Sequence, residues 1–409
     1  MYLDWMRTNM TAVELYIHIP FCIKKCNYCD FLSDVFPERI QEEYALCLCK
    51  EIKYMASLYP DVKVSTIFVG GGTPSWLDEN LMDKIITTVF SAFDVLPQAE
   101  VTIEANPGTL SSGKLNLYRS IGINRISIGL QSANDDELKE LGRIHDYNKF
   151  LHTYDLIRKA GFDNINVDLM TGLPHQTVEK LDHTLNAVTL LRPEHISAYS
   201  LIIEEGTPFF DKYHQDLKRQ EAGEPTLDGL PTDEDSYKLY KYATSYLEKK
   251  GYKRYEISNY CRPGKECLHN IGYWSRTPYI GLGLGASSLI NDTRASNIRD
   301  IYKYMEIASR LDYSLDYCNN PSSPLWNETV KLSKNDMVEE FMYLGLRKTA
   351  GISKNNFLAT FGKDISAYYG NQIEALKKQG FLDEKDDMLF LTDLGTDLSN
   401  QVLSQFLLD

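Results

Sequence analysis

Three cysteines on one short stretch are the residues of this sequence best suited to carry chemistry. Cys22, Cys26 and Cys29 follow the spacing C-x3-C-x2-C. Structural zinc takes four ligands, and C-x2-C is usually paired with a second such motif elsewhere in the chain. An iron–sulfur cube held by only three cysteines keeps one iron open for a small molecule. The spacing therefore favours such a cluster over three unrelated buried thiols or a redox pair.

Further polar residues lie where predicted strands end. A glycine run at 70–72 with Thr73 follows one strand, and glycine lets the backbone approach a ligand closely. Glu104, Gln131 and Asp168 end or follow later strands, and Arg143 closes a helical stretch. A lone carboxylate at a strand end is usually a solvated cap. Several polar groups at successive strand ends are expected to converge on one cavity.

Alternating strands and helices must position these residues. Strands are predicted at 13–20, 64–69, 100–104, 125–129, 164–169 and 195–203. Helical patterns lie between them at 38–58, 78–93, 111–120, 135–143 with 147–160, and 177–191. Six strand–helix units in a row predict a parallel sheet with right-handed crossovers, as an open six-unit or a closed eight-unit barrel. In both cases the site forms at the carboxyl ends of the strands.

The alternation lapses after about residue 203. A helix is predicted at 233–250, followed by a Gly- and aromatic-rich region at 252–289. Helices at 334–346, 354–361 and 372–379 and a hairpin at 381–391 suggest a small winged-helix-like domain. This domain carries acidic as well as basic residues and no basic recognition face, which favours a structural or lid role over DNA binding. The predicted organisation is a leader at 1–13, a core with its extension at 14–317, a linker at 318–330 and a C-terminal domain at 331–409.

Composition limits the class of protein. The 409 residues are 43% hydrophobic and 24% charged, with a net charge of −14. Nucleic acids and anionic membranes attract basic patches, so the acidic balance argues against both as general partners. No run approaches the ~18 apolar residues of a membrane span, and no apolar signal core opens the chain. Cysteines outside the cluster motif are most simply free thiols, which favours a cytoplasmic location.

Motifs along most of the chain resemble those of one family. They are YIHIPFC-x3-C-x-YCDF, GGGTPS, RISIGLQS, NVDLMTGLP, EEGTP, YEISNY, PGKECLHNIGYW and GLGLGASS. Together they resemble the radical S-adenosylmethionine (radical SAM) proteins, and among them the oxygen-independent coproporphyrinogen III oxidase-like family, from about Leu15 to the C-terminus. The resemblance implies an α/β fold: a radical-SAM partial (β/α)6 barrel with a smaller C-terminal winged-helix-like helical domain.

The resemblance also implies a set of cofactor residues. Cys22, Cys26 and Cys29 match the ligands of a [4Fe–4S] cluster whose open iron binds S-adenosylmethionine (SAM). The positions that match SAM contacts are Tyr16, Tyr28, Gly72, Thr73, Glu104, Gln131, Arg143 and Asp168. His18 shares a strand face with Tyr16, because side chains alternate along a strand, so it is either a pocket residue or a structural hydrogen-bonding group.

Two features separate the branches of this family. The true oxidases have a further cysteine where this chain has Phe31, whereas a haem chaperone branch carries H-N-x-x-Y-W. Here that motif is His269, Asn270, Tyr273 and Trp274. Imidazole is a standard axial ligand of haem iron, and aromatic side chains can cover a porphyrin. By the resemblance His269 is the haem iron ligand, although an aromatic cluster could equally hold a core histidine there.

The resemblance favours a haem chaperone that binds haem and passes it to acceptor haemoproteins, such as proteins of the respiratory chain. A radical-SAM enzyme of the same branch is the alternative, either a coproporphyrinogen III dehydrogenase or a methyltransferase. A cluster-dependent interaction protein without turnover is the third reading. A transient contact with a membrane protein and a homodimer fit the first reading, and whether SAM is cleaved stays open. Conversion of coproporphyrinogen is not expected.

Overall fold

A computed structural model describes residues 12–312 and 322–408 of the chain. The predicted leader lies outside the described residues except for Ala12 and Val13, as do residues 318–321 of the predicted linker.

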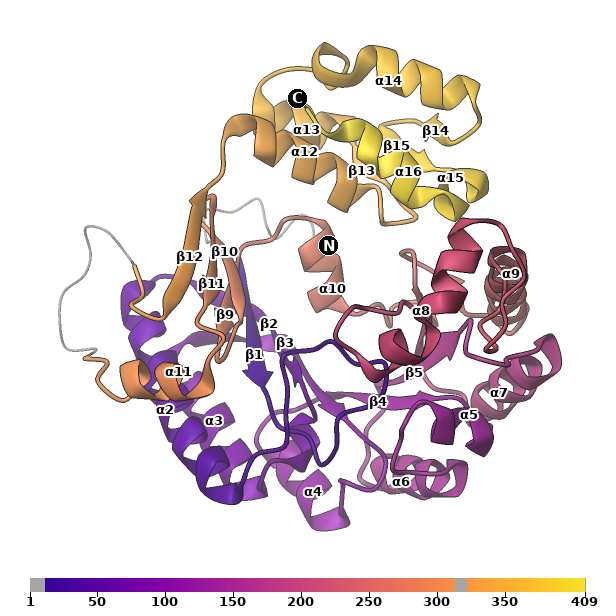
Figure 1. Ribbon diagram of the computed structural model, residues 1–409. Helices are drawn as coiled ribbons and strands as arrows, with labels where there is room; N and C mark the ends of the chain where they lie inside the picture. The colour runs from indigo at the N-terminus through magenta and orange to yellow at the C-terminus, as the bar shows by residue number, and fades with distance from the viewer. Residues whose placement is uncertain (1–11, 313–321, 409) are drawn as a thin grey trace.

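Six parallel strands form the centre of the molecule (Figure 1). They are β1 (Ala12–Ile19), β2 (Lys63–Gly71), β3 (Asp94–Ala105), β4 (Arg125–Gln131), β5 (Ile165–Thr171) and β6 (His195–Ser200). They lie side by side in chain order, and each is parallel to its neighbours. The predicted series of six strands is confirmed. Its carboxyl ends bring together loops that are far apart in the sequence.

Helices cover the outer face of this sheet. They are α2 (Glu38–Leu58), α3 (Glu79–Ala92), α4 (Ser112–Ser120), α5 (Asp135–Glu140), α6 (Tyr147–Lys159) and α7 (Val178–Leu191), with the short 3-10 turn η1 (Pro74–Trp76) after β2. Asp78, Ser111, Asp146 and Thr177 cap four of the helices by accepting a bond from a first-turn N–H. The predicted helix at 135–143 ends earlier, at Glu140.

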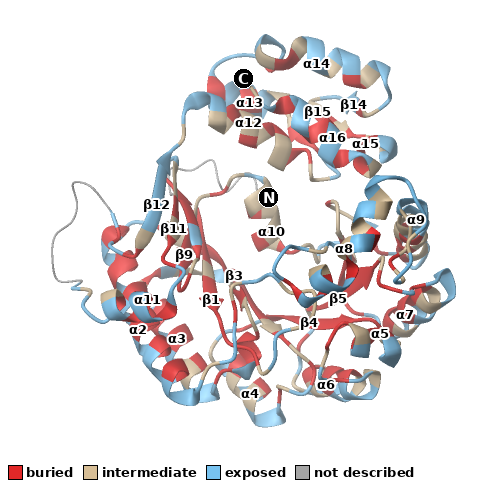
Figure 2. Cartoon of the chain, in the orientation of Figure 1, coloured by how far each residue is buried: buried red, intermediate tan, exposed pale blue. Residues whose placement is uncertain are grey.

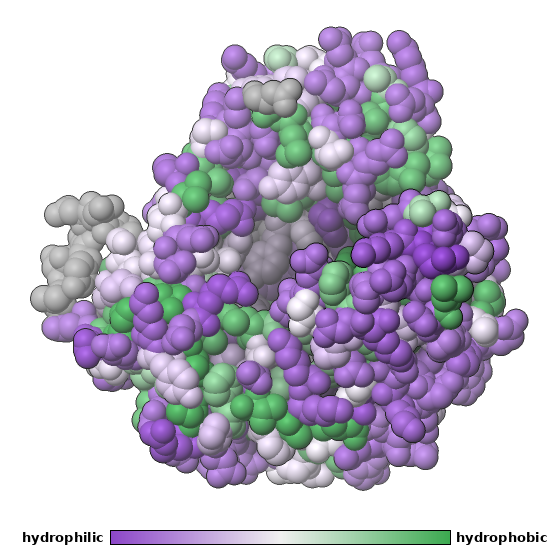
Figure 3. All heavy atoms as spheres, viewed as in Figure 1, coloured by the Kyte–Doolittle hydropathy of each residue, from purple (hydrophilic) through white to green (hydrophobic). Residues whose placement is uncertain are grey.

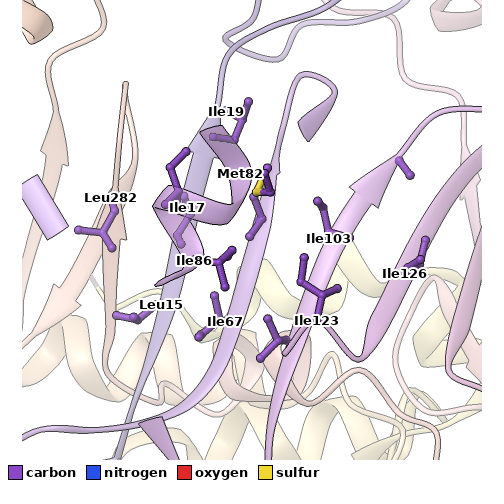
Figure 4. Close-up of a cluster of buried hydrophobic side chains, with 14 of the residues drawn as sticks. Leu15, Ile17, Ile19, Ile67, Met82, Ile86, Ile103, Ile123, Ile126 and Leu282 are labelled. Atoms are coloured by element: carbon purple, nitrogen blue, oxygen red, sulfur yellow. The ribbon is translucent and has the colours of Figure 1, made fainter. Parts of the chain in front are cut away.

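The strand alternation divides β1 between two environments. Leu15, Ile17 and Ile19 have no exposed surface and pack with residues such as Met82 and Ile86 of α3 (Figure 4). Figure 2 shows the same burial along the central strands. Burying such side chains contributes roughly 1.5–3 kcal/mol each. Tyr16 and His18 therefore lie on the opposite, inner face of the barrel.

The second half of the chain extends both edges of the sheet. β8 (Asn259–Cys261) and β7 (Lys253–Arg254) continue antiparallel beyond β6, whereas β9 (Tyr279–Leu282) lies parallel to β1. β10 (Ser287–Ile290), β11 (Thr293–Asn297) and β12 (Trp326–Lys331) complete that edge as antiparallel strands. The connecting helices are α8 (Pro208–Glu221), α9 (Asp233–Lys249), α10 (Leu268–Trp274) and α11 (Ile301–Ala308). β12 contains residues 326–330, which the sequence placed in a linker.

The C-terminal domain has a hydrophobic core of its own. It consists of α12 (Lys334–Gly345), β13 (Ile352–Ser353), α13 (Lys354–Phe361), α14 (Ser366–Lys378), β14 (Leu382–Lys385), β15 (Met388–Leu391), α15 (Asp393–Asp397), α16 (Ser399–Leu403) and the 3-10 turn η2 (Ser404–Phe406). The predicted helices and hairpin are present, and β13 adds a third strand to the hairpin. Throughout the described part of the chain, every helix is too short or too polar to span a membrane.

Candidate functional site

The cysteine loop follows β1, and its three thiols line one cavity of about 120 Å³. The Thr73 hydroxyl donates to Sγ of Cys22 at 3.7 Å, and Nη1 of Arg143 donates to Sγ of Cys26 at 3.5 Å. Among the described residues, no group of three or more His, Cys, Asp or Glu side chains could hold a single metal ion. Three separated thiols beside an open cavity suit the corners of a cluster with one open iron better than a mononuclear metal site.

Close packing explains the glycines beside this loop. A Cβ added to Gly72 would lie 2.8 Å from the carbonyl oxygen of Phe21 and 3.0 Å from Sγ of Cys22. Gly71 has φ +117°, and a Cβ there would lie 2.6 Å from the ring of His18. Both positions therefore require glycine. Their backbone brings the end of β2 directly against the cysteines.

Most of the predicted SAM residues share the cavity with the cysteines. Its wall includes Tyr28, Gly72, Thr73, Glu104, Gln131, Arg143 and Asp168. They come from the cysteine loop, from the turns after β2 and α5, from the ends of β3 and β4, and from the middle of β5. Tyr16 differs, because its side chain lines a neighbouring cavity and its hydroxyl lies 2.9 Å from Nδ1 of His18.

Two carboxylates and one guanidinium dominate the electrostatics of the cavity. Asp168 accepts from Nδ2 of Asn166 at 2.7 Å and from the hydroxyl of Ser127 at 3.1 Å. Burial, together with the neighbouring charge of Asp168, raises the pKa of Glu104 to about 8. Arg143 donates through Nη2 to the Gly129 carbonyl at 2.7 Å. A zwitterionic ligand that also carries a cation would find partners of both signs here.

Gln131 has an unusual backbone conformation at the end of β4. Its φ is +74°, in the left-handed region that non-glycine residues seldom adopt. The β4–β5 register shifts between Gly129 and Gln131, so the chain bulges at this point. Such bulges re-aim side chains and often lie beside functional sites. Here the bulge directs Gln131 to the cavity wall.

Sequence reasoning missed several wall residues, among them Asn106, Ser127 and Gly129. Asn106 donates to the Thr73 hydroxyl at 2.8 Å and accepts from Nη2 of Arg143 at 2.5 Å. It lies two residues after Glu104, so the period of a strand puts the two on the same side. That spacing could have identified it.

A second cavity, of about 550 Å³, lies between the barrel and the C-terminal domain. Figure 3 shows the hollow below that domain. Tyr273 and Trp274 of α10 line it together with Tyr16, His18, Tyr279, Gly285, Ala286, Ser287, Leu289, Arg294, Glu340, Tyr343 and Leu344. Much of the wall is aromatic, and its volume is in the usual range for small-molecule sites.

His269 lies deeper than this cavity and is only 1% exposed. Its Nδ1 is 2.7 Å from the Thr66 hydroxyl, and its ring stacks on Phe68 with centroids 5.2 Å apart. Tyr273 meets the ring edge-on at 4.7 Å and also lines the cavity. Nε2 has no hydrogen-bond partner in the described part of the chain, and burial lowers the pKa of His269 to about 3. Asn270 lines neither cavity.

A buried hydrogen-bond network links Asp168 in the first cavity to the start of α10, which carries His269. Asn166, which holds Asp168, lies 2.7 Å from Nδ1 of His195, and Nε2 of that ring lies 2.8 Å from the Tyr255 hydroxyl. The Tyr255 hydroxyl accepts from the backbone N–H of Cys267 at 3.2 Å. Glu100 then accepts from the N–H groups of Leu268 and His269 at 3.3 Å each. The first turn of α10 is thereby fixed to the layer of polar residues below the first cavity.

Comparisons with known proteins agree with this architecture. The Radical SAM superfamily model matches residues 16–188, and the HemN C-terminal domain model matches residues 332–398. The heme chaperone HemW of Bacillus subtilis is 35% identical over 398 residues, covering 96% of this chain and 98% of that protein. The chain belongs to the HemW family of radical SAM proteins.

HemW relatives from other bacteria are similar over the same extent. Heme chaperone HemW of Escherichia coli is 31% identical over 408 residues, covering 98% of this chain and 99% of that protein. Among solved structures, the radical SAM enzyme coproporphyrinogen III oxidase (HemN) of E. coli superposes with a TM-score of 0.80 at 22% identity, covering 99% of this chain and 92% of that one. The predicted fold class is thus confirmed. Membership of the radical SAM superfamily implies a [4Fe–4S] cluster and SAM.

Proposed function

We propose that this protein is a haem chaperone that binds haem in the second cavity and passes it to acceptor haemoproteins. The observation that carries the proposal is the aromatic cavity between α10 and α12, whose wall includes Tyr273 and Trp274 of the H-N-x-x-Y-W motif. Aromatic faces can cover the apolar plane of a porphyrin. The full-length similarity to proteins named heme chaperone HemW supports the same function.

His269 is the proposed protein ligand of the haem iron. If Nδ1 donates its proton to Thr66, the lone pair of Nε2 is free for a metal, since the partner of one ring nitrogen sets the role of the other. Tyr273 packs against this ring and reaches the cavity. The proposal therefore requires the Tyr273 ring to move aside when haem binds.

Cys22, Cys26 and Cys29 are the proposed cluster ligands, and the first cavity is the proposed SAM site. Glu104, Gln131, Arg143 and Asp168 would hold the polar groups of SAM, with Tyr28, Gly72 and Thr73 completing the wall. Tyr16 would act from the neighbouring cavity through His18. When bound, the cluster and SAM would supply one-electron chemistry. In the proposed chaperone the two together would have a regulatory or dimerising role.

The proposed acceptors are haemoproteins such as those of respiratory chains, reached from the cytoplasm, with transient contact to a membrane-bound acceptor and a homodimer as the working state. To test the function, haem is titrated into anaerobically reconstituted protein, and the loaded protein is mixed with an apo-haemoprotein. We expect saturable binding near one haem per chain and transfer that appears as the acceptor's spectrum. Absence of specific haem binding would overturn the proposal.

The second candidate is a radical-SAM enzyme acting on coproporphyrinogen III, and the HemN-like fold favours it. Phe31 argues against it, because it stands where the oxidases carry a further cysteine and is 68% exposed at the cavity wall. Product analysis on coproporphyrinogen III with SAM and a reductant separates the two candidates. We expect no protoporphyrinogen; turnover at roughly 1 per second or faster would establish the enzyme instead.

A further inference from the structure

A pair of charged residues lies in the wall of the second cavity. Arg294 extends from β11, donates through Nη2 to Oε1 of Glu340 at 2.6 Å, and donates through Nη1 to the Tyr279 hydroxyl at 3.2 Å. Glu340 belongs to α12 of the C-terminal domain, and its side chain is only 6% exposed. The ion pair therefore crosses from the barrel sheet to the C-terminal domain at the cavity itself.

Glu340 is shared with a second guanidinium. Nε of Arg276 donates to Oε2 of Glu340 at 2.8 Å. Arg276 follows α10 with φ +55°, in the left-handed region where helices usually place glycine. An arginine at this position therefore strains the backbone. One carboxylate thus faces two guanidiniums, and the cluster keeps a net positive charge.

The two arginines differ in their access to the cavity. Arg294 lines it and is 39% exposed, whereas Arg276 is 11% exposed and does not line it. Among the described residues, the cavity wall adds the phenols of Tyr279 and Tyr343 to the surroundings of Arg294 but no acid besides Glu340. Arg294 is therefore the cavity group suited to pair with an anion of a bound ligand, because a guanidinium binds carboxylate through two parallel hydrogen bonds.

We propose that Arg294 binds a carboxylate side chain of the ligand, and that Glu340 occupies this position only while the cavity is empty. The inference rests on the proposed function and specifies the ligand as a tetrapyrrole with free carboxylates. A ligand carboxylate replaces Glu340 on Arg294, while Arg276 retains Glu340. Binding thus weakens one of the two ion pairs through which Glu340 joins the C-terminal domain to the barrel.

Esterification of the ligand provides the test. Haem and haem dimethyl ester have the same iron and ring, but the ester carries no carboxylate charge. Tryptophan quenching and absorbance give the affinity of each for the wild type, R294Q and the control R310Q, whose arginine forms an exposed pair with Glu306. We expect R294Q to lose affinity for haem by on the order of tenfold. Its affinity for the ester, and both affinities of R310Q, should match the wild type.

E340Q gives an independent readout and guards against poor folding of R294Q. Since the competing acid is removed, we expect E340Q to bind haem several-fold more tightly and the ester without change. Hydrogen exchange in α12 should be faster in free E340Q than in the free wild type. Equal losses of haem and ester in R294Q, or unchanged haem affinity in both variants, would overturn the inference. A wild type that binds neither compound would overturn the proposed function itself.

Discussion

The hydroxyl of Thr66 lies 2.7 Å from Nδ1 of His269, and this contact fixes the imidazole within the barrel. The ring is held from one side by a strand residue and packed by Phe68 and Tyr273. Its other nitrogen has no partner among the described residues. An unsatisfied buried polar atom typically costs about 1–3 kcal/mol. A metal at Nε2 would remove that penalty, which favours a ligand role over a purely structural one.

Replacing His269 by alanine is expected to change the absorption spectrum of bound haem and weaken binding, because the iron loses its proposed protein ligand. Thr66→Val should have a smaller effect of the same kind, since the imidazole remains but loses the partner that orients it. Cluster content should be unchanged in both variants, since the cysteines lie in the other cavity. An unaltered haem spectrum in His269→Ala would make His269 a core histidine.

Acid should destabilise the protein partly through His269. The folded pKa is about 3 and the ordinary value is 6.5, so between these values the unfolded chain binds a proton that the folded chain does not. The contribution of the neutral His269 to the free energy of unfolding is complete above about pH 6.5 and is lost progressively toward pH 3. When the pH falls from 7 to 5, we expect His269 to lower the free energy of unfolding by about 2 kcal/mol. Denaturant unfolding of the wild type and His269→Phe at both pH values measures it, and equal pH dependence would contradict the assignment.

Loss of any one cluster cysteine should abolish the iron–sulfur spectrum. Cys26→Ala removes a thiol whose sulfur also accepts a hydrogen bond from Arg143. Among the described residues, the other cysteines that line this cavity are Cys22 and Cys29, which are themselves proposed ligands. Cys47→Ala is the matched control, because Cys47 is a buried thiol on α2 that bonds a backbone carbonyl. Iron and sulfide analysis after anaerobic reconstitution measures the content. A full cluster in Cys26→Ala would reject the ligand set.

Asp168→Ala should weaken SAM binding by about 1.5–3 kcal/mol, the range for a hydrogen bond to a charged group. The carboxylate is fixed by Asn166 and Ser127, so it is already oriented toward the cavity before the ligand arrives. Asp155→Ala serves as the control, since that acid forms an exposed pair with Lys159. Calorimetry on cluster-loaded protein gives both affinities. If Asp168→Ala and Asp155→Ala bind SAM with the same affinity, Asp168 does not contact SAM.

SAM affinity should rise with pH through the ionisation of Glu104. Because its pKa is about 8, the side chain is mostly protonated at pH 6 to 7, whereas the sulfonium cation of SAM favours the ionised form. Affinity should therefore increase between pH 6 and 8, by at most about tenfold per pH unit. Glu104→Gln should flatten this dependence. An equal slope in the variant would assign the titration to another group.

The regular part of the architecture could be predicted because its signals are local. Buried β-branched runs, helix caps and period-two alternation define the six strands and place Tyr16 and His18 on the inner face. The cysteine spacing and the strand-end residues likewise identified most of the first cavity. These features depend on neighbours a few residues away.

The remainder depends on pairing between distant segments. β9 pairs with β1 as a parallel strand, although more than half of the sequence separates the two. No local pattern in the glycine-containing sequence of β9 indicates that neighbour. Residues 326–330 of β12 were interpreted as part of a linker because they follow the proline- and serine-containing stretch CNNPSSP at 318–324. Five of the six residues of β12 are exposed at the sheet edge, so no buried pattern marks the strand. Of the second cavity, Tyr273 and Trp274 were expected from the sequence, whereas the contributions of β11 and α12 were not, because each of these distant elements supplies only part of the wall.

The placement of β12 also determines how the C-terminal domain is attached. Val330 of this strand is paired with Arg294 of β11, and only Leu332 and Ser333 separate the strand from α12. Leu332 is bonded through its N–H to Asp292, and Ser333 caps the helix. A rotation of the domain must therefore pivot on these two residues and pull on the ladder that carries Arg294. The width of the cavity and the position of Arg294 are therefore coupled through β12, and a change in one is expected to change the other.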